Sequence, residues 1–452
     1  MCLDGRDLPA PTAMNYIQAN IPVTKPARSA VPSCAKRMPT DATAAALLGT
    51  SPMDLSIWPV WPPHFGALFH VGLGLVLTAL AGEACRRVKL PAVSGYAAAG
   101  LLLGPPLLGW FDATALVTYR GVLDLCLALL LFELGVRLDV RWFGANPWVL
   151  AASLTEITLS FLLSFGALWA IGSGTALALA VAAVAVGTSP IVVMRVTAEQ
   201  RASGQVTDRL LALCALNVAA SVVLLKLVVG GLHGTQGDGQ LALLHPLYLL
   251  LGSIVGGALI ALAFAGLRKI VAPASEQGLA AIVALMLVAV AILNALRLPV
   301  VLAPLIAGAM VKWFDPRPHL WPAQFGSVGG ILVIVAFMLA GSAASLTQIM
   351  TGAILAVAAL VARATGKVAG VFAFGAASGL DRRKSIALGV ALMPLSVLAL
   401  LQVEDVRLLY PEFGGRLQPV VLGMVVVLAV FGPIATRWAL SHSNEARTGD
   451  KP

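Results

Sequence analysis

The sequence predicts an all-α polytopic membrane protein built from two inverted repeats, and three observations carry that prediction. Apolar residues make up 59% of the 452-residue chain and charged residues only 11%, whereas a soluble domain carries about 25% charged residues. Apolar runs long enough to cross a bilayer follow one another along the chain. Two of these runs are interrupted by proline beside small residues, and the motifs that precede them recur in the same order.

The chain divides into a tail, a membrane region and a second short tail. Residues 1–65 are polar and rich in Pro, Ala and Thr, so we expect them to be disordered. An alternative start at Met53, just ahead of the first apolar run, is a further hypothesis. The membrane region, 66–440, holds about thirteen candidate spans of roughly 20 residues, and 441–452 form a short tail. The spans are expected at 66–85, 92–110, 119–137, 147–171, 175–196, 208–230, 246–268, 277–296, 299–314, 326–346, 351–376, 385–403 and 418–438.

Basic residues alternate between the loops and predict the orientation of the chain. Loops after even-numbered spans carry only Arg120, Arg297, Arg407 and Arg416. The loops after odd-numbered spans and the C-terminal tail carry Arg86, Arg87, Lys89, Arg137, Arg141, Arg195, Arg201, Arg209, Arg268, Lys269, Lys312, Arg317, Arg382, Arg383, Lys384, Arg437, Arg447 and Lys451. Positive loops stay in the cytoplasm. We therefore expect a bacterial inner-membrane protein with its N-terminus outside and its C-terminus in the cytoplasm. The net charge of +9 reflects this topology and does not indicate a nucleic-acid partner.

An internal repeat relates the two halves of the membrane region. Lys89-Leu-Pro-Ala-Val…Ala99-Gly100 matches Arg297-Leu-Pro-Val-Val…Ala307-Gly308 at one constant offset. Pro190 interrupts the fifth span and Pro394 the twelfth. The matched spans lie an odd number of spans apart, so the two copies cross the membrane in opposite directions. Inverted repeats that each contain a discontinuous helix are typical of secondary transporters.

The interruption in the fifth span is the first candidate binding site. Gly187, Thr188, Ser189 and Pro190 stand inside an otherwise apolar run. Proline lacks the N–H that an unbroken helix needs, and freed backbone groups at membrane depth require a cavity or protein partners. We expect Thr188 and Ser189 to face a transported solute. A proline kink without a ligand is the alternative.

Other polar residues lie deep enough in the spans to join that site. Asn217 is near the middle of the sixth span, where it either coordinates the solute or makes an interhelical hydrogen bond. Arg363 and Lys367 share one face of the eleventh span, four residues apart. Lys367 could instead extend towards the cytoplasmic interface. Glu156, in the fourth span, is the acidic residue that best suits a deep ion pair or a proton carrier.

The remaining patterns do not indicate an enzyme. The histidines are scattered over the tail, loops and span ends, and the sequence shows no metal-ligand spacing, nucleophile–base pair or phosphate-binding loop. We expect no cofactor and no resident metal. The partners that composition predicts are the lipid bilayer and a transported solute.

Six motifs together resemble the monovalent cation:proton antiporters, in the branch of sodium/proton exchangers and glutathione-regulated potassium-efflux transporters. They are LPAVSGYAAAGLLLGP (90–105), LCLALLLFELGVRLD (125–139), GTSPIVVMRV (187–196), LLALCALN (210–217), LAPLIAGAMV (302–311) and RATGKVAG (363–370). The resemblance implies a homodimer, and a core domain in which two broken helices cross at Thr188–Pro190 and Met393–Ser396. It implies transport of a monovalent cation and of protons, and it places the basic residue of the family at Lys367.

One position departs from the family pattern. The resemblance places the ion-binding carboxylate after Asn217, and Val218 stands there. An antiporter would then need another proton carrier, Glu156 or Lys367, with the cation bound by Asn217, Thr188 and backbone carbonyls. The alternatives are a transporter of a small anion or organic carboxylate, and a transport-inactive homologue that acts as a sensor or partner subunit.

Overall fold

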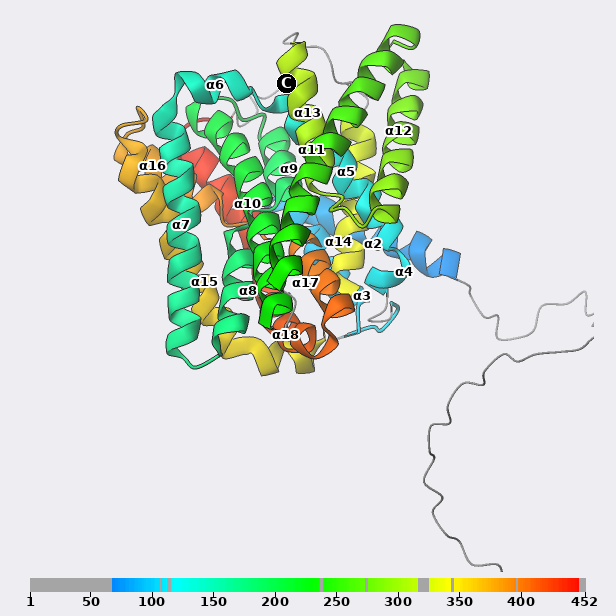
Figure 1. Ribbon diagram of the computed structural model, residues 1–452. Helices are drawn as coiled ribbons and strands as arrows, with labels where there is room; N and C mark the ends of the chain where they lie inside the picture. The colour runs from blue at the N-terminus through cyan, green and yellow to red at the C-terminus, as the bar shows by residue number, and fades with distance from the viewer. Residues whose placement is uncertain are drawn as a thin grey trace, which may run out of the picture. The chain divides into compact units, whose positions relative to one another are not determined.

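The computed structural model describes residues 67–105, 107–111, 115–235, 239–272, 275–315, 325–342, 345–395 and 397–446, and these form helices and their connections without a strand (Figure 1). The expected tail 1–65, the alternative start at Met53 and the last residues of the C-terminal tail, 447–452, lie outside them. The described residues therefore belong almost wholly to the membrane region.

Each apolar range coincides with one helix or with an interrupted pair. The helices are α2 (Ala67–Arg87), α3 (Ala92–Leu103), α4 (Ala115–Thr118), α5 (Arg120–Arg137), α6 (Val140–Ala145), α7 (Pro147–Ala170), α8 (Thr175–Val186), α9 (Pro190–Glu199), α10 (Gln205–Thr235), α11 (Gly239–Ile270), α12 (Glu276–Ala295), α13 (Leu302–Phe314), α14 (Phe325–Ser342), α15 (Leu346–Gly375), α16 (Arg382–Ala391), α17 (Val397–Leu409) and α18 (Pro411–His442). Seven stretches are long and apolar enough to cross a membrane by length and composition. The short helices α4 and α6 were not expected, and α3 ends before the predicted 110 because Gly104 and Pro105 follow it.

The two interrupted helices are broken where the sequence places proline. α8 ends at Val186 and α9 begins at Pro190, with its first turn capped by Ser189 Oγ, which accepts from the Val192 N–H at 3.4 Å. The second break begins at Leu392, one residue before the predicted start, and α17 resumes at Val397. Residue 396, predicted as the end of that break, lies outside the described residues.

Helix α5 separates two hydrophobic cores. Its Leu123, Leu127 and Leu131 belong to the larger core, which contains the broken helices together with α3, α10, α14, α15 and α18. Its Leu129 and Phe132 belong to the smaller core, which α5 shares with α11, α12 and α13. We call the helices of the larger core the broken-helix body and those of the smaller core the smaller body; α5 contributes to both cores, and we call their boundary along α5 the seam. Figure 1 shows α7 and α15 together at one edge of the bundle and α12 at the opposite edge.

The internal repeat is visible in the backbone. Lys89 and Arg297, the first residues of the matched motifs, both adopt a left-handed conformation with φ of 59° and 54°. In each copy the N–H of the next residue bonds back to the end of the preceding helix, Leu90 to Cys85 O and Leu298 to Leu293 O, both at 2.8 Å. This is the same helix-ending turn, made twice.

The helix packing repeats as well. A Cβ on Gly100 of α3 would lie 2.4 Å from Phe337 O and 3.2 Å from the Cα of Gly341 on α14. A Cβ on the matched Gly308 of α13 would lie 2.2 Å from the Phe132 carbonyl oxygen and 2.9 Å from the Cα of Gly135 on α5. The two copies therefore exchange equivalent close contacts, since α3 packs on α14 as α13 packs on α5.

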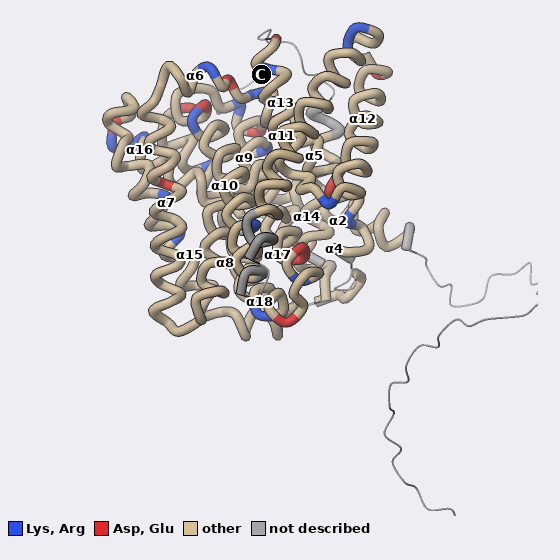
Figure 2. The backbone as a smooth tube through the Cα atoms, viewed as in Figure 1, with Lys and Arg blue, Asp and Glu red and all other residues tan. Residues whose placement is uncertain are grey.

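Charged residues concentrate at the ends of the helices. Figure 2 shows Lys and Arg gathered near α6, α16 and the turn between α11 and α12. These are loops that the sequence assigns to the cytoplasm. The interior of the bundle is mostly uncharged, and its few charged residues are therefore candidates for function.

Candidate functional site

The two breaks cross and bond to each other. The Ser189 N–H donates to Pro394 O at 2.8 Å, and the Thr188 hydroxyl donates to Leu392 O at 3.0 Å. Thr188 and Ser189 are each 1% exposed, so the crossing is buried in the bundle. Sequence analysis predicted both breaks and their crossing. The Ser189 side chain has a structural role there, because it caps the N-terminus of α9.

Asn217 of α10 lies against the first break. Its Nδ2 donates to Thr188 Oγ1 at 3.1 Å, and its Oδ1 has no hydrogen-bond partner among the described residues. The side chain is fully buried, as is that of Val218 beside it. The Asn217 amide oxygen is therefore available as a ligand for a cation at the break, whereas the Val218 side chain offers no ligand atom.

The Arg363 side chain reaches from α15 to both breaks. Its Nη1 donates to Ala185 O at the C-terminal end of α8. Its Nη2 faces three carbonyl oxygens of the second break, at 3.2, 3.0 and 3.4 Å, from Leu392, Met393 and Pro394. The C-terminal ends of helices carry partial negative charge. Arg363 neutralises the ends of α8 and α16 where they meet.

Lys367, one turn further along α15, makes a buried ion pair. Its Nζ lies 2.6 Å from Glu156 Oε1 of α7 and donates to Val186 O at 3.0 Å. Ser160 Oγ donates to the same carboxylate oxygen at 3.3 Å, while Glu156 Oε2 has no partner among the described residues. Both side chains of the pair are 0% exposed. The pair touches the last carbonyl of α8, at the edge of the first break.

Glycines on α15 allow this pair to form. A Cβ on Gly370 would lie 2.3 Å from the Glu156 Cα, and one on Gly366 would lie 2.6 Å from the Ser160 Cα. Larger residues at these places would push α15 away from α7. The close approach brings the two helix backbones together and lets the Lys367 ammonium reach the carboxylate directly.

The structure brings together most of the residues that sequence analysis singled out. Thr188, Asn217, Arg363, Lys367 and Glu156 lie around the crossing through the contacts given above. Gly187 and Pro190 lie at the ends of the first break, while Met393 and Pro394 supply carbonyls from the second. Their functional roles remain predictions.

Several neighbours of the site were not predicted from the sequence. Ser160 lies one turn after Glu156, a spacing that could have been used. Ser221 of α10 donates to Gln402 Oε1 at 3.3 Å, and a Cβ on Gly187 would lie 3.2 Å from Ser221 Oγ. Gln402 belongs to α17, and no sequence spacing connects it with α10. In the described part of the chain, His, Cys, Asp and Glu form no group of three or more that could hold a metal ion.

Comparison with known proteins gives a family and a fold. The model of the family described as sodium/hydrogen exchanger, transmembrane, matches residues 73–442. A Na⁺/H⁺-K⁺ antiporter, GerN of Bacillus cereus, is 33% identical over 99 residues, 22% of this chain and 25% of GerN. An iron transporter, MagA of Paramagnetospirillum magneticum (strain ATCC 700264 / AMB-1), is 33% identical over 128 residues, 26% of this chain and 28% of MagA. The matched segments thus span only about a quarter of each curated relative.

Two solved structures share the fold at low sequence identity. Both are of the sodium proton antiporter MjNhaP1 from Methanocaldococcus jannaschii. The structure at pH 8 has a TM-score of 0.62 and 16% identity, covering 83% of this chain and 96% of that one. The electron-microscopy structure has a TM-score of 0.64 and 16% identity, covering 85% and 99%. The likeness extends over nearly the whole described bundle.

Proposed function

We propose an activity on the premise that this chain belongs to the sodium/hydrogen exchanger family. The activity is the exchange of a monovalent cation, Na⁺ or K⁺, for protons. The protein would work as a homodimer in a bacterial inner membrane, with its C-terminus in the cytoplasm. The single observation that carries the proposal is the buried Glu156–Lys367 pair at the edge of the first break.

The pair supplies a titratable group where Val218 does not. With Lys367 protonated, the ammonium neutralises the Glu156 carboxylate. When Lys367 releases its proton, the buried carboxylate loses its counter-ion, and an unpaired charge in that place is costly. A monovalent cation then takes the place of the ammonium. One proton leaves as one cation binds, and protonation of Lys367 expels the cation again.

The surroundings of the pair favour a hard cation. The uncommitted Asn217 Oδ1 and the Thr188 oxygen are neutral oxygen ligands, as are the carbonyls at the breaks. Carbonyl and amide oxygens replace the hydration shell of alkali-metal ions in proteins. The contacts that support this arrangement are the bond from Asn217 to Thr188 and the bond from Lys367 to Val186 O, the last carbonyl before the first break.

The anion alternative is less well supported by the same contacts. Arg363 directs both terminal nitrogens at carbonyl oxygens, and Lys367 is held by Glu156 and Val186 O. An anion would have to displace these partners before the Arg363 or the Lys367 side chain could bind it. The transport-inactive alternative predicts a similar structure, so only a flux measurement separates it from exchange.

The test is exchange by purified protein in liposomes that contain a pH-sensitive dye. Na⁺, K⁺ or Li⁺ is added against an imposed pH gradient to wild type and to Glu156→Gln, Lys367→Gln and Val218→Asp. Wild type should move protons only when a cation is present. Glu156→Gln should lower the rate by about 100-fold or more, because a neutral amide lacks the negative charge that pairs in turn with the Lys367 ammonium and the metal cation. Glu133→Gln is the matched control, since Glu133 is also buried but pairs with Arg137, at 2.5 Å, away from the breaks.

Three results would contradict the proposal. Normal exchange by Glu156→Gln would remove the pair from the mechanism. Flux that follows an anion and ignores the cation would favour the anion alternative. A silent wild type, with exchange restored by Val218→Asp, would favour the transport-inactive alternative.

A further inference from the structure

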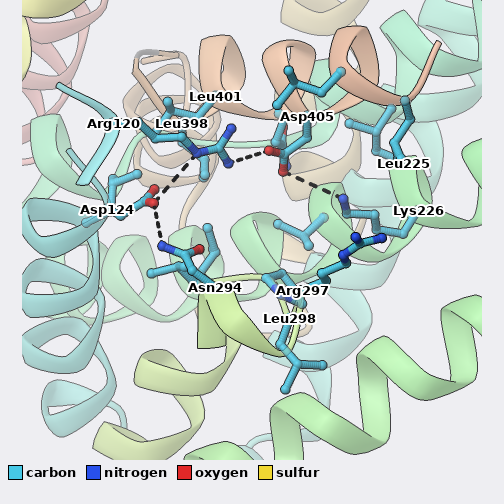
Figure 3. Close-up of a pocket in the computed structure, with 18 residues that line it drawn as sticks. Arg120, Asp124, Leu225, Lys226, Asn294, Arg297, Leu298, Leu398, Leu401 and Asp405 are labelled. Atoms are coloured by element: carbon cyan, nitrogen blue, oxygen red, sulfur yellow. Dashed lines mark hydrogen bonds and ion pairs between the residues drawn. The ribbon is translucent and has the colours of Figure 1, made fainter. Parts of the chain in front are cut away.

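A pocket of about 360 Å³ lies at the seam between the two bodies (Figure 3). Its polar lining comes from Arg120 and Asp124 of α5, Asn294 of α12, Lys226 of α10, Gln402 and Asp405 of α17, and Arg297 before α13. We call it the outer pocket, because the charge pattern predicts that these helix ends face outside. None of the functions proposed above uses its charged residues.

The deep side of the outer pocket leads to the crossing of the breaks. Gln402 lines the pocket and is 7% exposed, and its Oε1 accepts from Ser221 Oγ. Ser221 in turn lies against Gly187, the first residue of the first break. The Gln402 Nε2 has no partner among the described residues. The pocket therefore ends one hydrogen-bonded pair away from the candidate site.

Charged and polar side chains that line this pocket contact one another. Lys226 lies 3.6 Å from Asp405, and both belong to the broken-helix body. Asn294 Nδ2 donates to Asp124 at 3.2 Å, which joins α12 to α5 on the other side of the seam. Arg120 of α5 connects the two sides of the seam, because its Nη2 donates to Asp405 of α17. Figure 3 shows these contacts as dashed lines that run from Asn294 through Asp124, Arg120 and Asp405 to Lys226, among the side chains that line the pocket.

Arg120 has an acceptor on each side of the seam. In the structure it bonds Asp405, and its Nε lies 3.7 Å from Asp124, one turn along its own helix. The Asp124 side chain is 5% exposed and that of Asp405 is 30% exposed. If the bodies move apart at this end, Arg120 can exchange Asp405 for Asp124 and keep a carboxylate partner. Asp405 keeps Lys226. Arg120, Asp124, Lys226 and Asp405 then each have an oppositely charged partner in both arrangements.

We propose that Arg120 is a latch across the seam: bonded to Asp405 it holds the outer pocket closed, and bonded to Asp124 it lets the pocket open towards the breaks. This inference rests on the proposed function, because the latch would serve to give the transported cation access to the breaks from one side of the membrane at a time. Arg120 is a positioning residue here, since it acts through the separation of α5 and α17 and does not touch the crossing.

The test measures access to the pocket without measuring transport. Val222 of α10 lines the pocket and is 3% exposed, so Val222→Cys provides a reporter. The protein is placed in lipid nanodiscs, and the rate of labelling by a charged, membrane-impermeant maleimide is compared with that of a parent in which Cys2, Cys34 and the partly exposed Cys85 are serine, so that only the buried Cys126 and Cys214 remain. Arg120→Gln and Asp405→Asn should each raise the labelling rate about tenfold. A tenfold change corresponds to the loss of ~1.4 kcal/mol by which the ion pair favours the closed arrangement.

The opposite change distinguishes a latch from a general loosening. Asp124→Asn removes the acceptor of the open arrangement, so it should slow labelling below that of the Val222→Cys protein. Lys226→Gln leaves Asp405 without a cationic partner once Arg120 has moved to Asp124, so it should also slow labelling. Arg120→Lys should restore part of the slow labelling, which guards against a misfolded Arg120→Gln.

Two outcomes would overturn the latch. One is unchanged labelling in both Arg120→Gln and Asp405→Asn. The other is faster labelling in Asp124→Asn, because simple destabilisation of the pocket would affect all three variants alike. Failure of the proposed exchange would appear separately, as a wild type that moves no protons while the labelling rates still follow the pattern above.

Discussion

The two inverted repeats have nearly the same backbone and different chemistry. Lys89 and Arg297 end their helices with the same left-handed turn, and Gly100 and Gly308 make equivalent close contacts. The breaks differ. The first supplies the Thr188 hydroxyl, which accepts from Asn217 and donates to the second break, whereas the second supplies the carbonyl oxygens that accept from Thr188, Ser189 and Arg363. The shared features build the scaffold, and the unshared ones gather at the crossing.

The ion pair shows the same contrast on two helices that correspond in the repeat. α7 is the helix before the break in the first copy, and α15 is the helix before the break in the second. The first carries Glu156 and the second carries Lys367, and glycines bring the two together. Two copies of one helix thus supply an acid and a base to one pair, which a strictly symmetric protein could not do.

Breaking that pair should have the largest effect on stability. Lys367→Met leaves Glu156 buried and unpaired, which costs about 3–5 kcal/mol. The combined variant Glu156→Leu with Lys367→Met should recover most of the loss, because an apolar pair of similar volume is tolerated. Denaturant titration of the purified protein gives the coupling energy by a double-mutant cycle. Additive losses would show that the two side chains do not depend on each other.

Enlarging the matched glycines should have an intermediate effect, equal in the two copies. Gly100→Ala and Gly308→Ala place a Cβ within 2.4 and 2.2 Å of a carbonyl oxygen. Each should destabilise by about 1–3 kcal/mol through overpacking. Gly72→Ala, with open space around it in α2, should be neutral or stabilising. A large effect in one copy and none in the other would mean that the packing is not equivalent.

Relieving the left-handed turns should have the smallest effect. Lys89→Gly and Arg297→Gly remove a Cβ from a conformation that suits glycine, which should stabilise the protein by about 0.5–1 kcal/mol. The gain should be similar in both copies when thermal midpoints are compared in the same detergent. Destabilisation of one copy alone would show that its side chain has a role that the backbone match conceals.

Much of the scaffold could be predicted because its signals are local in the sequence. Apolar runs give the helices, prolines give both breaks, and a repeated motif gives the inverted relation. The i, i+4 spacing of Arg363 and Lys367 was enough to place them on one face. Asn217 and Glu156 were found from their depth in the spans, since polar groups are costly there.

The rest depends on contacts between helices that are distant in sequence. The close approach of α7 and α15 decides which carboxylate pairs with Lys367. The sequence around Glu156 does not indicate this partner. Lys226 of α10 lies beside Asp405 of α17, and no sequence spacing connects the two. The outer pocket is lined by residues of four helices and of the turn before α13, so it forms only when the bundle is assembled.

The Glu156–Lys367 pair has an electrical consequence. In the proposed cycle the site holds either a proton on Lys367 or a metal cation beside Glu156, and its net charge is the same in both. Arg363 keeps its positive charge throughout, so its contribution cancels over a complete cycle. Moving one elementary charge across a membrane potential of 100 mV changes the free energy by about 2.3 kcal/mol. Because the site carries the same net charge in both directions, this energy does not contribute to the exchange. A one-for-one exchanger of this kind would run on concentration gradients alone and be indifferent to the membrane potential.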